Sequence, residues 1–188
     1  MHGTPFNSPS LVREASPATT VLAFRTEPHG DAESVVEYLV QRDVLSPESP
    51  AASHVRTIFR APLEALRVNR IARRSYSSRR TIGRHFRAAG LPSPVDWIAL
   101  ARAVHAHRGI ARGEPLRMAA SLGGYPDQFT MSNAILRITG LRPSKLRNVS
   151  WTKLLDVWIA RQRERGALTG PPTPETPSCP LCGTPRAS

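Results

Sequence analysis

The sequence predicts an all-α protein in which two helix-turn-helix units are joined by a linker helix, with extra N- and C-terminal helices and disordered tails. Three observations support this fold class. Apolar residues recur at three- and four-residue spacing over most of the chain. Helix-capping and helix-ending residues bound these periodic segments. A short helix, a tight turn and a longer helix then recur at an offset of about 50 residues, as in proteins built from repeated units.

The composition is strongly basic. The chain of 188 residues carries 26 Lys and Arg against 14 Asp and Glu, a formal charge of +12, and only Lys145 and Lys153 are lysines. Arginine binds phosphate and guanine edges with its planar fork, so nucleic acid is the expected partner, with a functionless basic surface as the alternative. The sequence shows no run of about 18 apolar residues and no secretory signal, and it has two cysteines, so a cytoplasmic protein without a membrane span is expected.

The chain divides by composition into five segments. These are a disordered tail (1–20), a small N-terminal segment (21–61), the tandem helix-turn-helix domain (62–148), a C-terminal amphipathic helix (149–168) and a Pro-rich tail with a CxxC motif (169–188). The N-terminal segment is too short for a ligand-binding domain of ordinary size.

Two helices are expected in the N-terminal segment, after a short strand at Val21–Phe24. Asp31 is expected to cap a helix that ends near Arg42. After the break at Ser46–Pro50, Ser53 is expected to cap a short helix.

The first repeated unit contains the most informative helix. A short helix around Ile71 is followed by a break at Ser75–Ser77, and Ser78 then begins a helix that Gly90 ends. On this helix two opposed stripes follow the helical period: the apolar stripe holds Ile82, Phe86 and Ala89, and the basic stripe holds Arg80, Arg84 and Arg87. Such a helix is suited to packing on a protein body while pressing its arginines against a negative partner.

The linker and the second unit follow. A helix from Val95 to about His107 is expected, with Gly109 and Gly113 loosening the chain after it. A short helix at Leu116–Ala120, a turn at Gly123–Tyr125 and a helix opened by Asp127 then repeat the first unit, and Gly140 closes the second.

The C-terminal region contains one further helix, capped by Ser150. Its apolar stripe, which includes Trp151 and Trp158, either packs on the core of the same chain or pairs with a second copy in a homodimer. Cys179 and Cys182 form a single CxxC pair. Because a structural zinc site takes four ligands, a tail without metal is expected unless two chains each supply a pair.

Residues 62–148 resemble the DNA-binding domain of AraC-type transcription regulators, which carries two helix-turn-helix units bridged by a linker helix. The first unit of that family typically reads Ser-x-Arg-Thr-Leu-x-Arg-x-Phe, and Ser78–Phe86 matches it almost in full. In the second unit, Gly124-Tyr125, Ile135, Gly140-x-x-Pro143 and Arg147 keep the family's spacing. The chain departs from the family where Asn133 replaces the usual arginine and Phe129 replaces a small polar residue.

The resemblance implies that DNA is read from the major groove by the second helix of each unit. Arg80 and Arg84 are expected to contact bases, and Arg74, Arg79 and Arg87 to contact phosphates. Thr81 reaches a phosphate or serves only in capping. In the second unit the candidate DNA contacts are Thr130, Ser132, Asn133 and Arg137.

The second unit could equally be a structural remnant or a surface for protein contacts, because its outward stripe of Phe129, Asn133 and Leu136 is uncharged. Three functions therefore stay open: a sequence-specific transcription regulator that reads DNA mainly through the first unit, a protein–protein adaptor that keeps the fold, and a nonspecific nucleic-acid binder. No nucleotide-binding loop, nucleophile elbow or paired acid–base site is evident, so neither enzyme activity nor a cofactor is expected.

Overall fold

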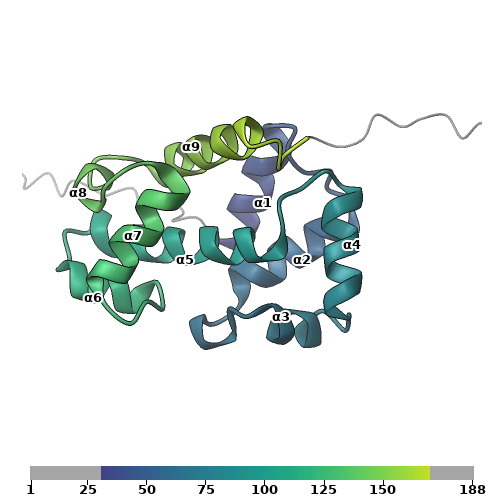
Figure 1. Cartoon of the computed structure of the whole chain (residues 1–188), viewed down its shortest axis with the longest axis horizontal. Coiled ribbons are helices and arrows are strands. Elements are labelled where there is room, and N and C mark those ends of the chain that lie inside the picture. The colour runs from purple at the N-terminus through teal and green to yellow at the C-terminus, as the bar shows by residue number, and fades with distance from the viewer. Residues whose placement is uncertain (1–30, 170–188) are drawn as a thin grey trace, which may run out of the picture.

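The computed structural model describes residues 31–169, and within this range the regular structure is entirely helical (Figure 1). This confirms the predicted all-α class. The helices are α1 (Ala32–Gln41), α2 (Pro50–Arg60), α3 (Val68–Arg74), α4 (Arg79–Ala88), α5 (Pro94–Ala111), α6 (Leu116–Leu122), α7 (Gln128–Thr139), α8 (Pro143–Leu146) and α9 (Trp151–Glu164), with a single 3-10 turn, η1, at Leu63–Ala65.

Helix α5 is the linker of the fold. It runs along the middle of the molecule, with α3 and α4 at one end and α6, α7 and α8 at the other (Figure 1). The expected end near His107 is wrong, since α5 continues to Ala111. Gly109 does not loosen the chain: a Cβ atom there would lie 3.0 Å from the Cα of Ala119, so the glycine allows α5 and α6 to pack closely.

Helices α1 and α2 pack on each other, and α2 also contacts α3, α4 and α5. Asp31 caps α1 as predicted, its carboxylate accepting a hydrogen bond from the Ser34 amide. The predicted cap of α2 is wrong: Ser49 caps the helix, and Ser53 lies inside it with its hydroxyl donating to the Pro50 carbonyl. Proline at the first helical position is a start signal, because its missing N–H has no partner there in any helix.

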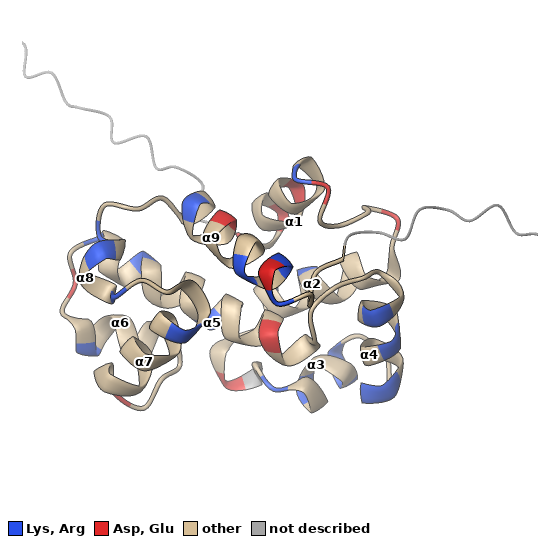
Figure 2. Ribbon diagram, turned by 45° about the horizontal axis from the view of Figure 1, so that its top comes forward, with Lys and Arg blue, Asp and Glu red and all other residues tan. Residues whose placement is uncertain are grey.

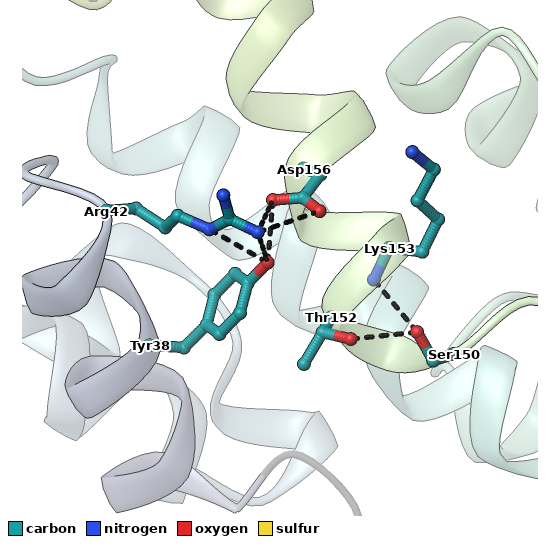
Figure 3. Close-up of polar contacts among 6 residues, drawn as sticks. All are labelled: Tyr38, Arg42, Ser150, Thr152, Lys153 and Asp156. Atoms are coloured by element: carbon teal, nitrogen blue, oxygen red, sulfur yellow. Dashed lines mark hydrogen bonds and ion pairs between the residues drawn. The ribbon is translucent and has the colours of Figure 1, made fainter.

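Helix α9 packs on α5 and α7. It also meets α1, where Tyr38 and Arg42 contact Asp156 of α9 (Figure 3). The Tyr38 hydroxyl donates to Asp156 at 2.6 Å, and Arg42 forms an ion pair with the same carboxylate. Burial and the hydrogen bond to Asp156 raise the pKa of Tyr38. Ser150 caps α9 as predicted, and its hydroxyl accepts from the Lys153 amide.

The apolar stripe of α9 faces the core of its own chain. Trp158 is buried, and its ring meets that of Trp97 on α5 edge to face, with centroids 4.8 Å apart. Of the two alternatives for this stripe, packing within the chain is the one observed. A homodimer built on Trp158 would have to compete with this buried contact.

Some sequence-based expectations lie outside the described residues. These are the N-terminal tail, the strand at Val21–Phe24 and the Cys179/Cys182 pair. Within residues 31–169, no helix combines the length and apolarity needed to cross a membrane.

Candidate nucleic-acid interface

The candidate interface is centred on α4, which packs on the core through one face and exposes the other face to solvent. Ile82 and Phe86 are buried, and the Phe86 ring lies edge to face with Trp97 at 6.2 Å. Ser78 caps the helix, its hydroxyl accepting from the Thr81 amide at 3.0 Å. The buried face and the cap fix the direction in which the opposite face points.

That opposite face carries the predicted arginine stripe. Arg80, Arg84 and Arg87 are exposed and together line a recess of about 340 Å³. The ion pairs among residues 31–169 involve other arginines, so no carboxylate neutralises the stripe there. Gly83 lies within this face, and an added Cβ atom would meet nothing within 4 Å. The three guanidinium groups are thus available to a ligand.

A second basic recess lies at the N-terminal end of α4. Arg79 at the start of α4 and three arginines of the α3 region surround a hollow of about 360 Å³; the arginines that line it are Arg67, Arg70, Arg73 and Arg79. Arg70 donates a hydrogen bond to the Glu64 backbone carbonyl. Arg74, the last residue of α3, is exposed. Sequence reasoning overlooked Arg67, Arg70 and Arg73 as site residues, although their spacing of three was visible and places them on one side of a helix.

The second unit presents a different surface. Phe129, Asn133 and Leu136 are exposed, as predicted for the outward stripe of α7, and Phe129 is 72% exposed. Arg137 is the one basic residue in α7, whereas α4 carries four arginines. Figure 2 shows the blue segments concentrated on α4. Of the two equivalent helices, α4 therefore exposes a stripe of arginines and α7 a stripe of uncharged side chains.

Three candidate hydroxyls already have local partners. Thr81 lies 2.8 Å from the Ser78 hydroxyl, Thr130 donates to the capping carboxylate of Asp127, and Ser132 donates to the Gln128 carbonyl one turn back. A DNA contact from any of them would have to share or replace that bond. Asn133 has no such competing partner among the described hydrogen bonds.

A histidine pair connects α4 to the helix behind it, which sequence reasoning missed. His54 on α2 is buried, and its Nε2 lies 3.0 Å from Nδ1 of His85, with the two rings stacked at 5.2 Å. One nitrogen must donate and the other accept, so the contact requires that the two facing nitrogens share one proton. Burial, and then the neighbouring His85, lower the pKa of His54.

The lowered pKa of His54 predicts that stability depends on pH. Because the pKa of His54 is lower in the folded than in the unfolded chain, its contribution is complete above about pH 6.5 and is lost as the pH falls through the folded value. We expect the free energy of unfolding, measured by urea titration, to fall between pH 7 and pH 5. The variant H54F should show a shallower fall, with a remainder from His105, whose pKa is also lowered by burial. Equal pH dependence in both proteins would contradict this role of His54.

A comparison with known protein families agrees with this geometry. The family model described as a helix-turn-helix domain matches residues 71–148, which begin within α3 and end two residues after α8. This match supports an AraC-type helix-turn-helix domain over residues 71–148. The AraC-type domain is a DNA-binding module of transcription regulators, so DNA binding is the activity of its class. The chain has no match among curated proteins or among solved structures.

Within the AraC-type domain, α3–α4 and α6–α7 are the two helix-turn-helix units and α5 is the linker. Both turns are closed by the same backbone bonds. Ser77 N donates to Ala72 O at 2.9 Å in the first unit, and Tyr125 N donates to Ala120 O at 2.9 Å in the second. The repeat inferred from the sequence is therefore present at the level of individual hydrogen bonds.

Proposed function

We propose that this protein is a sequence-specific transcription regulator that reads the major groove of DNA mainly through α4. The observation that carries the proposal is the exposed, uncompensated face of Arg80, Arg84 and Arg87 on a helix whose reverse face is buried. The second helix of a helix-turn-helix enters the major groove, and its early residues meet base edges.

The residues of the first unit divide by their position on α4. Arg80 and Arg84 are assigned to guanine edges, where arginine can pair with both acceptors. Arg79 and Arg87 flank them and are assigned, with Arg74 on α3, to phosphates, which position the protein without specifying sequence. Thr81 has the smaller role of supporting the cap.

The second unit is assigned a lesser part in DNA reading. Asn133 can pair with adenine, and Arg137 can reach a phosphate. Thr130 and Ser132 contribute less because their hydroxyls have local partners. The exposed Phe129 supports contact with a thymine methyl group, and it equally suits a surface for a protein partner.

Selection of bound sites from random double-stranded DNA tests the proposal. We expect one preferred site that resists competition by unrelated DNA. Affinity for this site should fall with salt, with a slope of about −0.9 for each phosphate contact in a plot of log K against log salt concentration. The measurement is a titration of labelled DNA at several salt concentrations.

The other functions predict different results in the same titrations. A nonspecific nucleic-acid binder would show the salt dependence without a preferred site. A protein adaptor that has lost DNA contacts would show no binding at moderate salt. Either outcome would contradict sequence-specific regulation.

A further inference from the structure

The turn between α3 and α4 contains an unusual residue. Tyr76 has φ +48°, in the left-handed region, and its side chain is 100% exposed. A bulky non-glycine residue seldom adopts this backbone conformation, because its Cβ approaches the carbonyl oxygen that follows it. Since the ring packs on nothing, no burial offsets the strain.

The second unit shows what the turn itself requires. Gly124, with φ +67°, occupies the equivalent place between α6 and α7. Tyr76 N donates to Arg73 O at 3.2 Å, and Gly124 N donates to Ser121 O at 2.9 Å, so the two residues have the same role in closing the turn. The turn needs a left-handed residue, and glycine supplies it without strain. A tyrosine in its place has no structural reason within the described residues.

The surroundings of Tyr76 indicate what its side chain could meet. Arg73 precedes it by three residues and Arg79 follows it by three, and both line the basic hollow beside α4. The turn leads directly into the N-terminal end of α4, which is the end that approaches DNA in a helix-turn-helix. A phenol hydroxyl is a good donor to a phosphate oxygen, and tyrosine is among the side chains that make such backbone contacts.

We propose that Tyr76 is a DNA-backbone contact, with its hydroxyl donating a hydrogen bond to a phosphate at the edge of the groove that α4 enters. This inference rests on the proposed function and adds to it a residue that positions α4 on the DNA. Strain retained at an exposed residue is typical of functional sites. The contact is independent of sequence, because every nucleotide presents the same phosphate.

Two variants separate strain from contact. The variant Y76G removes the side chain and relieves the strain, so we expect its melting temperature to rise by about 2–4 °C, the shift typical of a change of this kind in a chain of this size. We expect its affinity for DNA to fall roughly tenfold, as for loss of one hydrogen bond to a charged group. The variant Y76F keeps the ring and the strain, and should lose a similar factor in affinity with no change in melting temperature.

The binding titrations are made on both the selected site and unrelated DNA, at several salt concentrations. A phosphate contact predicts that both affinities fall by the same factor. The salt slope should stay that of the wild-type protein, because Tyr76 is uncharged and releases no counterion. The matched control is R84A, which should weaken binding to the selected site more than binding to unrelated DNA.

Wild-type affinity in Y76F, or a loss confined to the selected site, would overturn the assignment of Tyr76 while leaving the proposed function intact. Failure of the wild-type protein to bind DNA at all would instead contradict the proposed function. The melting temperature of each variant shows that it is folded, so reduced binding is not confused with unfolding.

Discussion

Replacing Arg84 with alanine is expected to weaken binding to the selected DNA site by about 1–3 kcal/mol, or roughly 5- to 150-fold, as for loss of a two-bond pair with guanine. Replacing Asn133 with alanine should have a much smaller effect. Arg84 belongs to the exposed arginine face of α4, whereas Asn133 lies between two apolar side chains on α7. Because both residues are exposed, neither variant should change the free energy of unfolding by more than about 0.5 kcal/mol.

A charge-conserving variant sharpens this test. R84K keeps the positive charge but lacks the planar fork, so it should lose preference for the selected site while keeping most of the salt slope. Fluorescence anisotropy with selected and unrelated DNA measures both properties. Equal losses in R84A and N133A would contradict a reading dominated by the first unit.

Replacing Trp158 with alanine is expected to lower the free energy of unfolding by about 3–5 kcal/mol, because the truncation leaves a large cavity in the core. Trp158 is 1% exposed and joins α9 to α5 through its contact with Trp97. The variant W151A is the matched control. Trp151 is half-buried against Tyr38, so its removal should lower stability less.

Unfolding in urea at two protein concentrations completes this experiment. If α9 packs within its own chain, the midpoint is independent of protein concentration in wild type and variant alike. A midpoint that rises with concentration would mean that association contributes to folding, as in an obligate dimer. That result would favour sharing of the Trp151/Trp158 helix between two chains.

The features of the interface that depend on local sequence could be predicted. Ser78, Asp127 and Ser150 are predicted at helix starts because a side-chain oxygen just before a periodic segment can accept a hydrogen bond from an amide of the first turn. The two stripes of α4 are predicted because the helical period alone places Arg84 on the side of the helix opposite Ile82 and Phe86. Such predictions need only the geometry of one helix.

The errors have different physical causes. Ser53 is predicted as the cap of α2 because Ser46–Pro50 resembles a break in the chain, whereas Ser49 caps the helix and Pro50 begins it. Gly109 was taken to loosen the chain, yet its contact with Ala119 on α6 keeps it inside α5. The short helix α8 was not expected, since four residues are too few to show a period.

The pairing of His54 with His85 could not be predicted, because 31 residues separate them and His85 occupies an unspecified position of the Ser78–Phe86 motif. The strain at Tyr76 was likewise hidden, since a tyrosine in a turn segment has no unusual backbone conformation until the chain folds around it.

By itself, the amino-acid sequence determined most of the helices and their caps, the repeat and the arginine stripe of α4. Each depends on residues within a few positions of one another, and the repeat on two such local patterns. Only the tertiary structure decided that α9 closes on its own chain through Trp97 and Trp158, and that α2 supports α4. It also revealed that Tyr76 stands where Gly124 stands in the other unit. These outcomes depend on packing between segments far apart in the chain, which no local pattern records.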